Sequence, residues 1–167
     1  FPAMHGYELD HEGVEPVFAA AAEAGAAVFV HCGVLTVGVR RKLKLPTRIN
    51  VRAGDPLAVA SLASRYPHVP VVIPHFGAGF LREALMAADL CPNIYLDTSS
   101  SNGWLKYLPG LTLTEVFRQA LETLGPDRLL FGTDSSFFPR GWQRSVYETQ
   151  ASILDGLGID TGARARI

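Results

Sequence analysis

The chain has 167 residues, of which 48% are hydrophobic and 19% are charged, with a net charge of −1. This length allows one domain with a sizeable core, and this composition excludes an intrinsically disordered protein. The near-neutral charge argues against nucleic acid or an anionic membrane as partner. The sequence contains no uncharged apolar run of about 18 residues, so no transmembrane helix is expected.

The first half of the chain alternates between helical and strand-like patterns. Residues 15–24 are alanine-rich and stop at a glycine, which predicts a helix, and the apolar run AAVFV predicts a strand over 26–30. The Asp-Pro pair that opens residues 55–66 is typical of a helix N-cap and first helical position. The run VPVVI then predicts a second strand over 69–73.

The second half repeats this alternation. Residues 81–90 predict a helix that ends before a proline, and the run NIYL predicts a strand over 93–96. Residues 112–124 begin with a capping-box pattern and end before Gly-Pro, which predicts another helix. The run RLLF predicts a strand over 128–131, and a fifth helix is expected over 143–157.

The four predicted strands do not alternate with polar residues, which is typical of parallel strands covered on both faces. Strand, helix, strand and helix in succession predict an α/β fold with right-handed crossovers. The strands end about 34 residues apart on average, close to the unit of an eightfold barrel. An open doubly wound sheet has a similar spacing, so the rhythm alone leaves both architectures open.

A polar residue that can take part in catalysis or metal binding follows each predicted strand within three residues. These residues are His31, His75, Asp97 and Asp134. Catalytic and ligand-binding residues of parallel α/β folds collect at this edge of the sheet. Imidazole and carboxylate ligands suit zinc, which keeps an open position for water and lowers the pKa of that water towards about 7.

Each of these residues alone has a simpler interpretation. A single His after a strand is commonly a hydrogen-bonded loop residue, and a single Asp commonly caps the next helix or turn. The coincidence of all four at the same edge favours a site over these alternatives.

Four stretches of the chain together resemble the amidohydrolase-related branch of the metal-dependent hydrolases, whose members are distorted (β/α)8 TIM barrels. They are EPVFAAAAEAGAAVFVHCG, GDPLAVASLASRYPHVPVVIPHFG, NIYLDTSS and GPDRLLFGTDSSFFP. Their order and spacing are similar to strands five to eight of that family. The resemblance implies a parallel α/β barrel, of which this chain is about the C-terminal half.

The resemblance also implies roles for individual residues. His31 would be the strand-five metal ligand, and Asp134 the strand-eight carboxylate that contacts the metal and takes a proton from its water. His75 would bind a second metal or polarise the substrate and move protons. Asp97 receives no role, and His5 is expected either to line the pocket or to be an exposed loop residue. The expected cofactor is a divalent metal, zinc first and manganese second.

The family's His-x-His pair on strand one is absent from this chain. Four strands, with a strand remnant at residues 1–4, cannot close an eight-stranded barrel. We therefore expect residues 1–167 to be one domain that forms the C-terminal part of a barrel, with the metal pair upstream.

Substrate-binding residues are expected in two loops. The segment 40–52 carries six of the 15 basic residues, and we expect Arg48 and Arg52 to bind an acidic substrate group, although a solvated loop is the simpler interpretation for most of this segment. Arg140 lies in an aromatic loop after Asp134 and is a further candidate. Cys32 and Cys91 lack metal-type spacing, so we interpret them as reduced thiols of a cytoplasmic protein.

Three functions are compatible with these residues. The first is metal-dependent hydrolysis of a small carbonyl substrate such as a lactone, ester or amide. The second, in the same family, is metal-dependent, non-oxidative decarboxylation of an aromatic or unsaturated acid. The third is a non-catalytic α/β binding module. The sequence has no glycine-rich phosphate loop after any predicted strand, which argues against this third function. A small-molecule substrate is the expected partner, and self-association into a homo-oligomer stays open.

Overall fold

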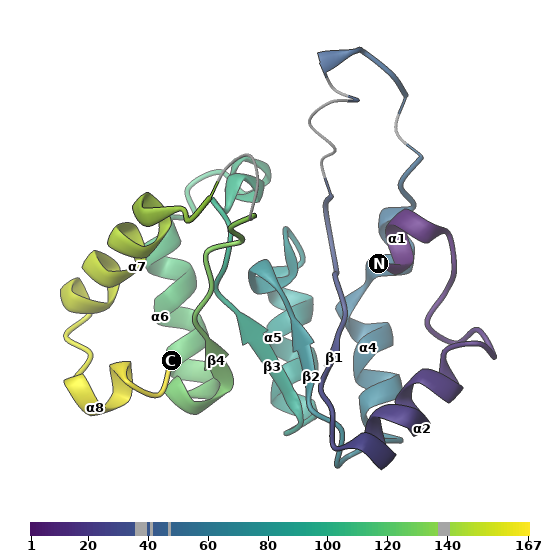
Figure 1. The fold of residues 1–167 in the computed structure, drawn as a ribbon. Coiled ribbons are helices and arrows are strands. Elements are labelled where there is room, and N and C mark those ends of the chain that lie inside the picture. Colours follow the sequence, from purple (N-terminus) through teal and green to yellow (C-terminus); the bar gives the residue numbers. More distant parts are fainter. Residues whose placement is uncertain (36–39, 41, 47, 137–140) are drawn as a thin grey trace.

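A four-stranded parallel sheet forms the centre of the computed structural model, which describes residues 1–167 except 36–39, 41, 47 and 137–140. The strands are β1 (Val28–Phe29), β2 (Val71–Ile73), β3 (Ile94–Asp97) and β4 (Leu129–Leu130). Each strand pairs in parallel with the next in the order β1-β2-β3-β4 (Figure 1). The predicted parallel α/β fold is confirmed.

Helices form within all five predicted ranges, and two further short helices lie near the first and last residues. They are α1 (Pro2–His5), α2 (Glu15–Ala24), α4 (Pro56–Ala63), α5 (Leu81–Leu90), α6 (Leu113–Leu124), α7 (Arg144–Gly156) and α8 (Thr161–Arg164), with short 3-10 helices η1 (Val51–Gly54), η2 (His75–Gly77), η3 (Gly103–Tyr107) and η4 (Pro126–Arg128). None of the helices in the described ranges has the length and apolar character needed to span a membrane.

The two N-cap residues predicted from the sequence cap their helices. Asp55 caps α4 by accepting a hydrogen bond from the Leu57 amide at 2.9 Å. Thr112 caps α6 by accepting one from the Glu115 amide at 3.2 Å. Helix α4 ends at Ala63, three residues before the predicted end, and the Ser64 hydroxyl there donates to the carbonyl oxygen of Ser61.

The predicted strand remnant at residues 1–4 is wrong. Pro2–His5 is one helical turn, in which Pro2 occupies the first position and Gly6 closes the turn in the left-handed conformation. Proline is well tolerated at this position because its missing N–H would have no partner within the helix. His5 therefore ends a helix rather than a strand.

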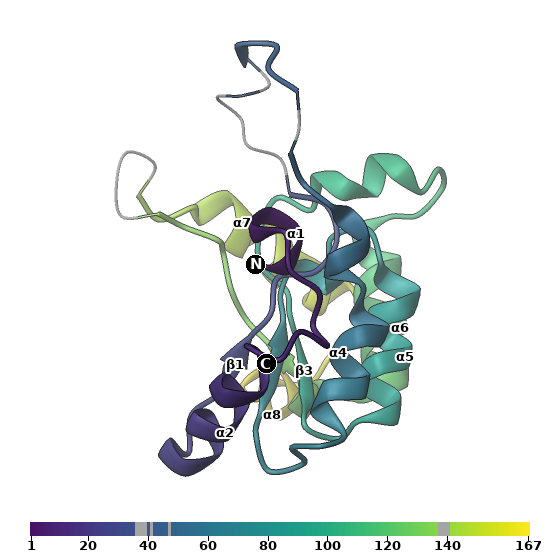
Figure 2. The ribbon, with the colours of Figure 1, turned by 90° about the vertical axis from the view of Figure 1, so that its right-hand side faces the viewer.

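The two faces of the sheet differ in exposure. Helices α4, α5 and α6 lie along one face (Figure 2). Register and alternation place Phe29, Val72 and Tyr95 side by side on the other face, where Phe29 is 59% exposed. Leu130, in register with Asp97 on that face, is 36% exposed. The expectation of strands covered on both faces is therefore correct for β2, which is buried throughout, but not for the edge strands β1 and β4.

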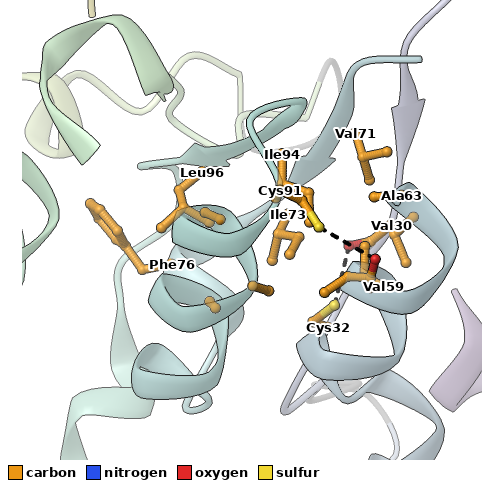
Figure 3. Packing of buried hydrophobic residues seen from close by; sticks show 14 of the residues in the cluster. Val30, Cys32, Val59, Ala63, Val71, Ile73, Phe76, Cys91, Ile94 and Leu96 are labelled. Atoms are coloured by element: carbon orange, nitrogen blue, oxygen red, sulfur yellow. Dashed lines mark hydrogen bonds between the residues drawn. The ribbon is translucent and has the colours of Figure 1, made fainter. Parts of the chain in front are cut away.

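The core lies between the sheet and these helices. Cys32 and Cys91 are both buried there as free thiols, among the apolar side chains of Figure 3. The Cys91 thiol donates to the carbonyl oxygen of Ala60 at 3.4 Å. Burial, aided by the carboxylate of Asp55, raises the pKa of the Cys32 thiol to about 12. Both cysteines are thus free thiols, in agreement with their interpretation as reduced, and the high pKa keeps Cys32 in its unreactive thiol form.

Candidate functional site

The residues that follow the four strands lie at the carboxyl edge of the sheet. His31 comes two residues after β1, His75 two residues after β2, Asp97 ends β3, and Asp134 comes four residues after β4. Carboxyl ends of neighbouring parallel strands meet at one edge, which is why residues from four distant parts of the sequence share it.

His31 and His75 form a close pair at this edge. Their ring centroids are 5.3 Å apart, and His31 is only 5% exposed. Burial is the main cause that lowers the pKa of His31 to about 4, and the neighbouring His75 adds to the effect. The His31 imidazole is therefore neutral at pH 7, and the neutral form is the one that binds a metal.

The loops after β1 and β2 hold this pair by close backbone packing. His75 has a φ of 58°, a conformation that non-glycine residues rarely adopt. The Val34 amide donates to the carbonyl oxygen of Ala78 at 2.8 Å, and the Gly33 amide donates to that of Gly54 at 3.0 Å. Such a left-handed residue persists only where its surroundings determine it, and these contacts supply that constraint.

Asp97 joins the ends of β2 and β3. Its Oδ1 accepts hydrogen bonds from the Ser99 amide at 2.9 Å, from the His75 amide at 3.3 Å and from the Ser99 hydroxyl. The Ser99 hydroxyl oxygen lies 2.8 Å from Nδ1 of His75. Asp97 is 8% exposed, so these donors replace the water that its carboxylate has lost. The Asp97 carboxylate therefore organises the loop that carries His75.

Asp134 lies in a constrained turn after β4. Its φ is 54°, and the Gln143 side-chain amide donates to the carbonyl oxygens of Asp134 at 3.0 Å and Thr133 at 3.2 Å. The Asp134 side chain is exposed. Among the described residues, no three His, Cys, Asp or Glu side chains are grouped closely enough to hold a metal ion. The structure therefore brings His31 and His75 together, but not Asp134 with them.

A buried glutamine joins β3 and β4 just below this edge. Gln150, from α7, is 2% exposed, and its side-chain amide donates to the carbonyl oxygens of Thr98 at 2.9 Å and Gly132 at 3.0 Å. Its Oε1 accepts the Thr98 hydroxyl at 2.6 Å. Gln150 thereby connects the segment that contains Ser99 with the one that leads to Asp134.

We predict that Gln150→Leu lowers the free energy of unfolding by about 3 kcal/mol, because it leaves the carbonyl oxygens of buried Thr98 and partly buried Gly132 without this donor. Urea unfolding measures this change. Gln119→Leu is the matched control, since that half-buried side chain bonds to Glu115 on its own helix, and it should cost less than about 0.5 kcal/mol. Equal costs for both variants would contradict the role of Gln150.

The other predicted site residues are exposed or lie outside the described residues. His5 is exposed at the end of α1, with its ring 6.1 Å from that of Phe1, which in turn lies 5.2 Å from the ring of His31. Arg48 is exposed in the loop before η1. Arg52 lines a cavity of about 800 Å³ beside α4, and neither His31 nor His75 borders that cavity. Arg140 lies outside the described residues.

Sequence reasoning missed Ser99, Gln150 and Gly132 as parts of this edge. A Cβ on Gly132 would lie 2.6 Å from Oδ2 of Asp97 and 2.8 Å from Cβ of Ser99, so glycine is needed there for close packing. The Asp-x-Ser pattern at 97–99 is the one signal in the sequence that pointed to the turn. The Gln150 contacts span 52 residues to Thr98, and no local pattern reveals them.

With this geometry established, comparison with known proteins identifies the family. The chain matches the family described as Amidohydrolase (Amidohydro_2) over residues 1–167. It belongs to the amidohydrolase family. A curated relative, the fluG protein of Emericella nidulans, is 33% identical over 91 residues, which is 54% of this chain and 10% of that protein.

Solved structures of amidohydrolase-family and TIM-barrel proteins share this fold. An uncharacterised TIM-barrel protein from Bordetella bronchiseptica superposes with a TM-score of 0.67 at 22% identity, over 96% of this chain and 48% of that chain. An amidohydrolase from Burkholderia multivorans with bound zinc superposes with a TM-score of 0.64 at 15% identity, over 95% of this chain and 55% of that chain. A dihydroxybenzoic acid decarboxylase from Polaromonas with bound manganese superposes with a TM-score of 0.61 at 16% identity, over 96% of this chain and 52% of that chain.

This chain thus spans about half the length of its structural neighbours and only a tenth of the curated relative. The half-barrel expectation for the fold is confirmed. The exposure of Phe29 and Leu130 follows from it, because the face that carries them corresponds to the inside of the barrel, which four strands do not enclose.

Proposed function

We propose that the native protein containing this chain is a metal-dependent hydrolase that acts on a small carbonyl substrate such as a lactone, ester or amide. The observation that carries the proposal is the pair of imidazoles, 5.3 Å apart, at the carboxyl edge of a parallel sheet in an amidohydrolase chain. The bound zinc of the amidohydrolase among the structural neighbours supports a metal in the proposed function.

The donors in this chain fit part of a metal site. His31 is buried and neutral, and His75 lies beside it, so both suit zinc or manganese. The described residues do not complete a set of three donors, which agrees with a chain that spans half of the barrel. We propose that residues outside this chain supply the remaining ligands and that Asp134 joins them from the loop after β4.

A metal held by these residues would polarise the substrate carbonyl and increase the acidity of a water molecule. Asp134, in its constrained turn, would accept the proton from the attacking water. His75 would assist in passing that proton to the leaving group. The positive φ values of His75 and Asp134 hold both loops in sparsely populated conformations, as is common for residues that must be preorganised.

Decarboxylation is the second candidate. The manganese-containing dihydroxybenzoic acid decarboxylase among the structural neighbours favours it, as do the exposed guanidinium groups of Arg48 and Arg52, which could bind a carboxylate. The two reactions would use the same histidines, so the products distinguish them. We expect the native protein to hydrolyse lactones, and release of CO2 from hydroxybenzoate-type acids without hydrolysis would favour the decarboxylase.

We predict that His31→Ala, made in the native protein purified without chelator, removes most of the bound divalent metal and at least about 99% of the activity, since a ligand and not a supporting group is lost. Metal content is measured by elemental analysis of the purified protein. His68→Ala is the matched control, because His68 is exposed and precedes β2, at the opposite end of that strand from His75. A wild-type protein without divalent metal, together with unchanged activity in His31→Ala, would refute the metal-dependent function and favour a binding module.

A further inference from the structure

We propose that Ser99 and Asp97 act as a positioning pair that holds His75 in the tautomer with its proton on Nδ1 and its lone pair on Nε2. Neither Ser99 nor Asp97 has a role in the function proposed above. The assignment of the tautomer is independent of that function. Only the use of the unprotonated Nε2, as a metal ligand or proton acceptor, rests on the proposed function.

The surroundings of His75 Nδ1 consist of oxygen atoms. The Ser99 hydroxyl oxygen lies 2.8 Å away, the Ser99 carbonyl oxygen 3.3 Å away and Oδ1 of Asp97 3.8 Å away. A carbonyl and a carboxylate can only accept hydrogen bonds. A bare Nδ1 would therefore face two acceptors and be repelled by both, whereas a protonated Nδ1 is stabilised by them.

The direction of the Ser99 hydroxyl decides its role. Its oxygen lies within hydrogen-bond distance of Oδ1 of Asp97, and a carboxylate oxygen requires the hydroxyl to be the donor there. With its single proton engaged, the hydroxyl oxygen can only accept from His75. The direct separation of 3.8 Å between Nδ1 and Asp97 is too long for a hydrogen bond, so Ser99 bridges the two groups.

The Asp97 carboxylate is itself held in place from two sides. The backbone amides of Ser99 and His75 donate to its Oδ1, at 2.9 and 3.3 Å. Its Oδ2 lies against Gly132, where a Cβ would approach to 2.6 Å. Three donors on one oxygen fix the position of the carboxylate, and that oxygen in turn orients the Ser99 hydroxyl.

This arrangement resembles the support that metal-binding histidines commonly have. Such a histidine usually donates its second ring N–H to a carboxylate or carbonyl, which fixes the ring and leaves the other nitrogen free for the metal. Here a serine is inserted between the imidazole and the carboxylate, and a backbone carbonyl adds a second acceptor. His75 is thereby prepared to present Nε2 before any metal or substrate arrives.

The test is the tautomer of His75 in metal-free native protein labelled with ¹⁵N-histidine. Long-range ¹H–¹⁵N correlation at alkaline pH separates a protonated ring nitrogen from a bare one, and the signal missing in His75→Gln identifies the residue. We expect Nδ1 of wild-type His75 to be protonated and Nε2 to be bare. In Ser99→Ala, a substantial fraction with the proton on Nε2 should appear, because only the longer contacts to Nδ1 remain.

The matched control is Ser101→Ala, since this exposed serine lies two residues further along the same loop, and it should leave the His75 signals unchanged. A wild-type His75 with its proton on Nε2 would overturn the proposal, as would a Ser99→Ala spectrum identical to that of wild type. If Ser99→Ala does not fold, the wild-type spectrum decides alone. Because no metal or substrate takes part, failure here is distinguishable from failure of the proposed hydrolase.

Discussion

Asp134→Asn should lower kcat of the native protein on its hydrolysable substrate by about 10²–10⁴-fold, with a much smaller change in KM. Asparagine preserves the shape of the side chain but cannot accept a proton, and removal of a general base typically has an effect of this size. The turn at Asp134 should persist, because Gln143 holds it through the backbone carbonyl of residue 134 and not through the carboxylate. Steady-state kinetics with a lactone measure both constants.

Asp89→Asn provides the control for this experiment, since Asp89 is an exposed residue on α5. It should leave kcat within about twofold of wild type, as expected for a surface substitution away from the site. An Asp134→Asn protein with wild-type kcat would show that the carboxylate takes no part in the reaction. Loss of metal together with loss of activity would instead indicate that Asp134 acts mainly as a ligand.

Gly33→Ala should lower the free energy of unfolding by about 2–5 kcal/mol. Gly33 has a φ of 70°, which costs an L-residue about 1–2 kcal/mol. A Cβ there would also lie against the carbonyl oxygens of Gly77 and Ala78 and 2.8 Å from the carbonyl carbon of Ala78. These are backbone atoms that cannot move aside, so an overpacking cost of about 1–3 kcal/mol is added. Urea unfolding of the native protein measures the sum.

Gly25→Ala separates the two causes. Gly25 has a similar φ of 61°, but a Cβ there would meet no atom within 4 Å. It should cost only the conformational part, about 1–2 kcal/mol. Equal losses in the two variants would show that the loops after β1 and β2 are not closely packed. We also expect Gly33→Ala to weaken metal binding, because those loops carry His31 and His75.

The fold of this chain could be predicted largely from local sequence signals. Helices over 15–24 and 81–90 are observed at the expected bounds, because a terminal glycine or proline defines each end. The one wrong element is the strand remnant at residues 1–4, where a proline at the first position and a glycine at the last instead form a helical turn.

The candidate site could be predicted only in part. His31 and His75 were identifiable because each follows closely after an apolar strand, and the carboxyl edge of a parallel sheet brings such residues together. Their supporting residues were not identifiable, since Ser99 and Gln150 act through contacts across 24 and 52 residues. The local sequence around a serine or glutamine does not reveal a hydrogen-bond partner so far away in the chain.

The sequence by itself therefore determined the order of strands and helices, the apolar core and the polar residues that end each strand. These follow from residue spacing and from the conformational preferences of glycine and proline, which act over a few residues. Only the tertiary structure decided which of those polar residues meet, because this depends on loop packing between distant segments. It places His31 beside His75, connects His75 to Asp97 through Ser99, and leaves Asp134 apart from them in this half of the barrel.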